Sequence, residues 1–131
     1  SQEVSASTEE VSATVEEQTS VMNHLAEEVE ALKADVNTLN ASIEKFKEVN
    51  NWTLTHQQYS QGAKEKFMDT SRADIYLVSY AAVVPNEWTV VSQEKPAPFS
   101  SSEIKLPDAC NHFNVRCIRF MEMFREMNET F

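Results

Sequence analysis

The 131-residue sequence has one Gly and four Pro, too few for a fold dominated by tight turns and long loops. Two Cys cannot supply the disulfide framework of a small secreted domain, so we expect Cys110 and Cys117 to be reduced, packed thiols, with a disulfide as the alternative. No run of about eighteen apolar residues occurs, which predicts no membrane contact within this chain. Together these absences favour a helix-rich cytoplasmic protein.

Basic residues are also scarce, and their distribution is uneven. Residues 1–50 hold eleven Asp and Glu against three Lys, whereas residues 51–131 hold ten acidic against eight basic residues. The net charge of −10 disfavours tight nonspecific binding to nucleic acid, which depends on Lys and Arg that neutralise phosphates. A nuclease is still possible, because a metal ion held by carboxylates can contact the phosphate instead.

A heptad repeat organises residues 1–48, which carry no Gly or Pro. Two seam positions alternate at steps of four and three, one mostly β-branched and the other becoming Leu. Such a pattern predicts a coiled-coil helix, and a stripe this narrow needs a partner helix, so we expect self-association. The seam residues are Val4, Val11, Val15, Met22, Leu25, Val29, Leu32, Val36, Leu39, Ile43 and Phe46.

The first heptads carry a second pattern, in which the pairs Glu9-Glu10 and Glu16-Glu17 lie one heptad apart among Ser, Thr and Ala. On charge alone, such pairs are the solvated face of a coiled coil. With the following MNHLAEEVEALKADVNTLNASIEKFK, however, the segment resembles the C-terminal methylation helix of bacterial chemoreceptors (methyl-accepting chemotaxis proteins). That resemblance implies that these four Glu residues are sites of methylation-type modification.

A change of pattern near Val49 divides the chain into residues 1–48 and 49–131. Asn50 and Asn51 interrupt the heptads, and either can cap a new helix, which we expect over residues 52–68. His56 has no paired His or Cys nearby and is expected on the surface. The sequence leaves open whether the join is a natural or an engineered fusion.

Residues 73–95 alternate helix and strand in a way that brings two acids to candidate positions. Asp74 lies in the first turn of an expected apolar helix, where free N–H groups favour an ionised carboxylate. Pro85 ends that helix, residues 88–91 (WTVV) read as a buried strand, and Glu94 follows the carboxyl end of the strand. Ligand chemistry gathers at such strand ends in open α/β sheets.

The segments ADIYLVSYA and VVSQEK, with the later run EIKLPDACNHFNVRCIRFMEMFREM, resemble the PIN-like family of toxin-type nucleases. The resemblance covers residues from about 50 to 131 and only the C-terminal half of such a domain, without its opening D-[TS]-N strand. It implies a partial three-layer α/β unit with a short parallel sheet. It also implies that Asp74 and Glu94 are catalytic ligands of Mg²⁺ or Mn²⁺, acting on RNA, with an antitoxin-like protein as a possible partner.

Because about four acids form such sites, this incomplete set predicts weak metal binding and little or no activity. The alternative is a chemoreceptor-type signalling or interaction coiled coil with a non-catalytic C-terminal domain.

For the remaining chain we expect a short edge strand at 104–106, a helix starting at Pro107 and Asp108, and a strand at 115–118. A helix over 119–127 carries a Met and Phe stripe expected to lie in the core.

Overall fold

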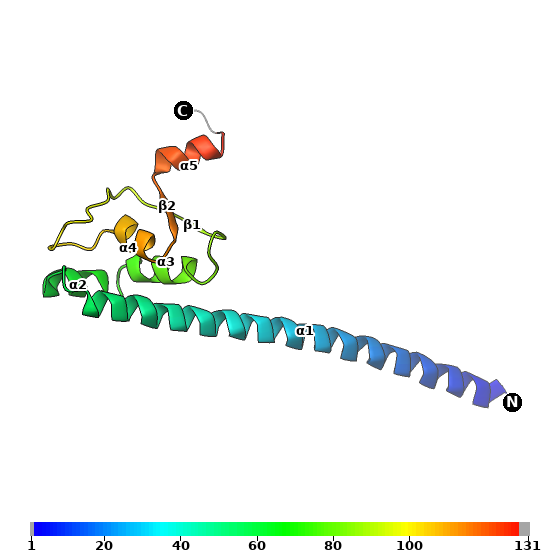
Figure 1. Cartoon of the computed structure of the whole chain (residues 1–131). Coiled ribbons are helices and arrows are strands. Elements are labelled where there is room, and N and C mark those ends of the chain that lie inside the picture. The colour runs from blue at the N-terminus through cyan, green and yellow to red at the C-terminus, as the bar shows by residue number, and fades with distance from the viewer. Residues whose placement is uncertain (1, 129–131) are drawn as a thin grey trace. The chain divides into compact units, whose positions relative to one another are not determined.

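The computed structural model describes residues 2–128, as five helices joined to a two-stranded sheet. The chain divides into two compact units, residues 1–39 and 40–131. The expected long N-terminal helix and short parallel sheet are confirmed (Figure 1). The elements are α1 (Gln2–Thr55), α2 (Gln61–Phe67), α3 (Asp74–Ala81), β1 (Thr89–Val91), α4 (Leu106–His112), β2 (Arg116–Ile118) and α5 (Phe120–Glu126).

Helix α1 does not end at Asn50 or Asn51, so the expectation of a new helix there is wrong. It continues to Thr55 because its last turns are packed into a core, with Val49 and Thr53 fully excluded from solvent. The Thr53 hydroxyl donates to the carbonyl of Val49 at 2.9 Å, so this buried polar group keeps a partner inside the helix. Burial therefore overrides the local capping signal, and α2 begins only at Gln61.

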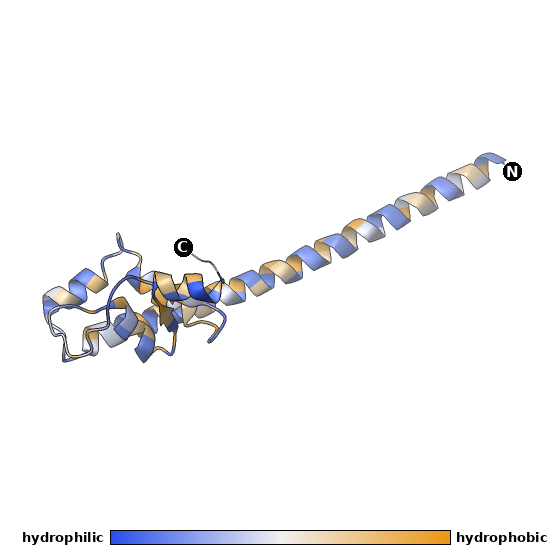
Figure 2. Ribbon diagram, turned by 90° about the horizontal axis from the view of Figure 1, so that it is seen from above, coloured by the Kyte–Doolittle hydropathy of each residue, from blue (hydrophilic) through white to orange (hydrophobic). Residues whose placement is uncertain are grey.

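Within residues 2–39, α1 is the whole structure, and its apolar side chains lie in solvent. Hydrophobic residues recur along the helix between hydrophilic ones (Figure 2). The exposed fractions of the seam residues run from 43% at Val29 to 69% at Val4. Among residues 2–128, no helix has both the length and the apolarity that crossing a membrane requires. The exposed stripe is accordingly a surface without an intramolecular partner.

The second unit has its own hydrophobic core, formed by the end of α1 with α2, α3, α4 and the sheet. Ile75 and Val78 of α3 and Ala109 of α4 are fully excluded from solvent. Phe46 of α1 stacks on Tyr76 of α3 with ring centroids 5.4 Å apart. The apolar face expected for the helix after Ala73 is buried except at Leu77, which is 42% exposed.

Strands β1 and β2 pair in parallel, with Val90 opposite Cys117, and α4 lies between them in sequence. Both strands lie within the segments expected at 88–91 and 115–118. The expectation that residues 88–91 are buried is wrong except at Val90, since Trp88 is 47% exposed. The edge strand expected at 104–106 is wrong, because Leu106 is already the first residue of α4 and Pro107 occupies its first turn. A parallel pair requires such a crossover, which a two-residue turn cannot provide.

Helix α5 forms where the sequence predicts it, but the expectation that its Met and Phe stripe lies in the core is wrong. None of its residues is buried, and Phe120 and Met127 of the stripe are 42% and 60% exposed. Phe120 stacks on Phe124 within the helix itself, with centroids 6.5 Å apart. The period of an apolar stripe predicts the helix, but it does not tell which surface covers the stripe.

Candidate functional site

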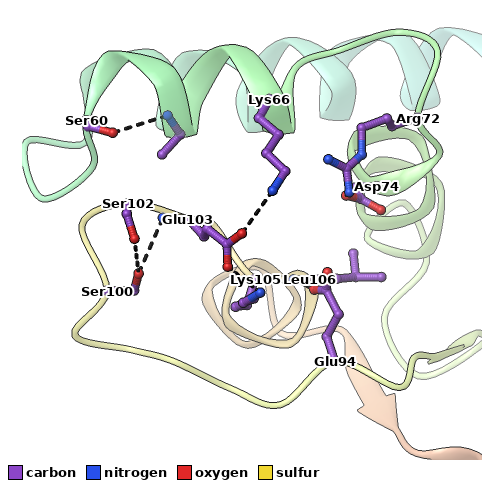
Figure 3. A network of polar contacts seen from close by, with 11 residues as sticks. Ser60, Lys66, Arg72, Asp74, Glu94, Ser100, Ser102, Glu103, Lys105 and Leu106 are labelled. Atoms are coloured by element: carbon purple, nitrogen blue, oxygen red, sulfur yellow. Dashed lines mark hydrogen bonds and ion pairs between the residues drawn. The ribbon is translucent and has the colours of Figure 1, made fainter.

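Asp74 at the start of α3 and Glu94 after β1 line one small cavity of about 40 Å³. The other charged residues around it are Lys66 of α2, Arg72, and Glu103 and Lys105 from the segment before α4. We call this group of three acids and three bases the charged cavity (Figure 3). The volume is enough for a few water molecules or one small ion. Residues distant in sequence therefore meet here, as the two sequence motifs suggested.

Asp74 occupies the first turn of α3, whose N-cap residue Ala73 offers no side-chain acceptor. An acid in that turn interacts favourably with the unpaired N–H groups of the helix start. Its Oδ2 lies 3.6 Å from Nη2 of Arg72, and the two side chains are 22% and 38% exposed. Asp74 thus has a cationic neighbour among the residues that line the cavity.

Glu94 has a structural partner as well. Its Oε2 accepts a hydrogen bond of 2.7 Å from the backbone N–H of Leu106, the first residue of α4. Its own backbone N–H donates to Oγ of Ser92 at 3.1 Å. Glu94 therefore ties the end of β1 to the start of α4, which is a charge-assisted contact with an otherwise unpaired helix donor.

Glu103 forms two ion pairs on the wall of the cavity. Its carboxylate oxygens lie 2.9 Å from Nζ of Lys66 and 2.5 Å from Nζ of Lys105. The hydrogen bond from Lys105, followed by that from Lys66, lowers the pKa of Glu103 to about 2. The same hydrogen bond raises the pKa of Lys105, and the nearby charge of Glu94 adds to the rise. The bases of the cavity are thus engaged by its acids.

We tested whether these residues fit the Mg²⁺ or Mn²⁺ ion that a PIN-like site implies. Carboxylate oxygens are the right ligand type, and Mg²⁺ often uses only one or two of them together with substrate phosphates. Yet residues 2–128 contain no group of three or more His, Cys, Asp or Glu side chains arranged to hold a metal. Asp74 and Glu94 already contact Arg72 and the Leu106 N–H, and three cations surround them. The donor set therefore does not fit a tightly held ion.

The four Glu residues of the chemoreceptor-like pattern all lie on exposed turns of α1. In the heptad register that places Val15 in the seam, Glu9 and Glu16 occupy one outer position and Glu10 and Glu17 the next. A partner on the seam would leave all four accessible. The structure thus presents these carboxylates without bringing another functional group to them.

Reasoning from sequence did not find the basic half of the charged cavity. Lys66 and Glu103 pair although they are 37 residues apart, and no motif spacing links them. Arg72 is an isolated base before an expected helix, and Lys105 lies in the expected edge strand at 104–106. A hint was present in the balanced charge of residues 51–131, but it does not identify partners.

His56, expected on the surface, instead belongs to an aromatic cluster around Trp52. Its ring lies 5.4 Å from Trp52 and 4.9 Å from Tyr59, and His112 of α4 stacks on Trp52 at 4.9 Å. In the described chain, Nδ1 of His56 and Nε1 of Trp52 are buried without a hydrogen-bond partner. Burial, and secondarily the neighbouring His56, lowers the pKa of His112.

Cys110 and Cys117 are free thiols, as expected. Cys110 is fully excluded from solvent, and its thiol contacts that of Cys117 in β2. Burial raises the pKa of both thiols, so neither forms the reactive thiolate at neutral pH. Their role is packing between α4 and the sheet.

The fold and the site define a small α/β unit joined to a long heptad helix, with acids and bases balanced in one cavity. The chain belongs to the family described as Domain of unknown function (DUF4411), which matches residues 2–131. The match thus includes both the heptad segment and the α/β unit. Comparison with curated proteins gave no match, and comparison with solved structures gave none.

Proposed function

We propose that residues 49–131 form a PIN-like, toxin-type endoribonuclease module that is weakly active or inactive by itself, and that residues 1–48 form its oligomerisation helix. The observation that carries this proposal is the convergence of Asp74 and Glu94 on one cavity, although they are twenty positions apart in sequence. A helix-start acid and a strand-end acid meeting beside a parallel sheet support a partial three-layer α/β unit of this class.

The composition of the cavity supports weak rather than efficient chemistry. A metal-dependent nuclease uses carboxylates that are free to hold the ion, which activates water and stabilises the phosphate being cleaved. Here each of the two acids must first give up an existing partner, and Lys66 and Lys105 are bound to Glu103. We therefore expect metal affinity in the millimolar range and RNA cleavage near background.

Thermal unfolding with and without Mn²⁺ tests the proposal. At an ion concentration equal to its dissociation constant, binding stabilises the folded state by about 0.4 kcal/mol, or roughly 2–3 °C in a domain of this size. We expect a shift of that order at millimolar Mn²⁺, and its loss in Asp74→Asn. Glu87→Gln, which removes an exposed acid before β1, is the matched control and should keep the shift.

Either extreme contradicts the proposal. No difference between the parent chain and Asp74→Asn at any Mn²⁺ concentration means that the acids form no site, and the nuclease-type assignment is lost. Saturation at micromolar Mn²⁺, with rapid cleavage of single-stranded RNA that Asp74→Asn abolishes, means that the site is complete rather than incomplete.

A second candidate function is that of an interaction protein, of which a chemoreceptor-type signalling coil is one form. The exposed seam of α1 favours it, because a run of Val and Leu along 39 residues has no intramolecular cover. The partner is then a second copy or another helix, and an antitoxin-like protein or RNA would act on the other unit. Val29→Asp should abolish association measured by sedimentation, whereas Glu27→Gln on the outer face should not.

A further inference from the structure

The heptad register of α1 assigns every residue between Val15 and Phe46 to a position relative to the seam. We use the usual letters, in which a and d are the two seam positions and e and g flank them. Each apolar seam residue from Val15 to Ile43 is at least 43% exposed. Position a holds Val15, Met22, Val29, Val36 and Ile43, and position d holds Gln18, Leu25, Leu32, Leu39 and Phe46.

The shapes of these side chains set the number of strands. β-branched residues at a combined with Leu at d favour two-stranded over three- or four-stranded parallel coils. Four of the five a positions are Val or Ile, and three consecutive d positions are Leu. The seam is also confined to a and d, which is the narrow stripe of a two-helix contact rather than the wider face of a globular core.

The flanking charges set the orientation. Within residues 15–43, acids stand at g (Glu28 and Asp35) and a base stands at e (Lys33). In a parallel, in-register pair each g residue faces the e residue of the next heptad on the other helix, so Glu28 faces Lys33 of the second copy, twice per dimer. In an antiparallel pair g faces g and e faces e, so like charges would meet.

We propose that residues 15–43 of α1 associate with the same residues of a second copy of this chain, as a parallel, in-register, two-stranded coiled coil. The proposal rests on the second candidate function, association through α1, and does not depend on the charged cavity. The partner of the exposed seam is then the same helix of a second copy, and the two helices run in the same direction. Both copies of residues 40–131 then follow from the same end of the coil.

The side chains that form the interchain pairs are available for them. Lys33 now lies 3.1 Å from Glu30, and both side chains are about two-thirds exposed or more. Glu28 lies 3.0 Å from His24 in an equally exposed pair. Exposed pairs of this kind contribute little, so exchanging them for interchain pairs costs little.

Two cysteine variants of the 131-residue chain test the arrangement in a glutathione redox buffer. In a parallel, in-register coil, equal d positions lie side by side, so Leu25→Cys and Leu39→Cys should each link to its own copy. Glu27→Cys, on the outer face, is the control and should link at least about tenfold more slowly. Peptide mapping separates these links from the native, packed Cys110 and Cys117.

Charge variants supply an independent readout by sedimentation equilibrium. Lys33→Glu places like charges at both interchain pairs and should weaken dimerisation roughly tenfold, and Glu28→Lys should act similarly. Combining the two restores opposite charges and should recover most of the affinity. In an antiparallel coil like charges meet in the parent chain and in each single variant, so neither single substitution would weaken dimerisation much and the double variant would have nothing to recover.

The outcomes separate the two levels of the proposal. A chain that stays monomeric from micromolar to millimolar concentration overturns both self-association and this arrangement. A chain that dimerises but forms neither cysteine link, or only one of them, overturns the parallel, in-register arrangement and leaves self-association standing.

Discussion

Replacing Glu94 with Ala discriminates between the two roles that this acid can have. In the structure its Oε2 accepts the Leu106 N–H at 2.7 Å, so the side chain closes the segment between β1 and α4. Leu106 itself is 5% exposed and belongs to the core. The substitution therefore leaves a backbone donor of a helix start without its acceptor, next to buried side chains.

The size of the effect follows from the kind of hydrogen bond that the substitution removes. Removing a side-chain acceptor from a helix start costs about 0.5–2 kcal/mol, and an unsatisfied buried donor costs about 1–3 kcal/mol. We expect Glu94→Ala to destabilise the second unit by about 1–2 kcal/mol, or roughly 5–12 °C. Glu94→Gln keeps an acceptor oxygen and loses only the charge, so it should cost about half as much.

Near-UV circular dichroism is the suitable assay, because the long helix dominates the far-UV signal, whereas Trp52 packs against the core of the second unit. Glu87→Ala removes an exposed acid from the turn before β1 and serves as the control, with a change below about 0.5 kcal/mol. Protein concentration must be held constant, since association shifts apparent stability. Equal melting temperatures for the Glu94 and Glu87 variants would refute the structural role of Glu94.

Three further predictions concern the core and its titrating groups. Ile75→Ala, at a fully buried position of α3, should cost about 2–5 kcal/mol, whereas Leu77→Ala, 42% exposed on the same helix, should cost clearly less in urea titrations. The pKa of His112 is lowered by burial below its ordinary 6.5, so the unfolded chain binds this proton first. His112 should thus leave stability unchanged above pH 7 and lower it as the pH drops through 6.5. His112→Gln should flatten that fall, and His24→Gln on the exposed part of α1 should not. Because burial raises its pKa, Cys110 should react with iodoacetamide at least about tenfold more slowly in the folded chain than in urea.

Those elements whose signals are local could be predicted from the sequence. One short segment contains both the strand at residues 88–91 and the acid that follows it. Pro107 and Asp108, which predict the start of α4, are likewise adjacent in sequence. The prediction of an edge strand at 104–106 is wrong because a segment of three residues does not show whether it pairs with a neighbouring strand. In the structure the backbone N–H of Leu106 donates to the Glu94 carboxylate across the loop instead. The periodic pattern of apolar residues cannot predict a hydrogen bond between residues that are twelve positions apart.

The candidate site was predictable in its acids and not in its bases. Asp74 and Glu94 follow from their places at a helix start and a strand end, and the structure brings both to one cavity. Lys66 enters it only because α2 packs where Glu103 can reach it, and Lys105 lies two residues from Glu103 in the segment before α4. Whether carboxylates are free to hold a metal depends on such neighbours, which explains why a motif alone overstates the site.

Phe46 shows how one residue pattern serves two different surfaces. The heptad register assigns it to the seam, at position d after Ile43, yet its ring stacks on Tyr76 and packs against the core of the second unit. Ile43 is 45% exposed, so the available seam ends there. A coiled coil that extended through Phe46 would have to remove that ring from the core, at a cost of several kcal/mol for a large aromatic side chain. The length of any coil formed by this chain is therefore limited by the fold of residues 40–131, and the change from intermolecular to intramolecular packing falls between Ile43 and Phe46, within a single continuous helix.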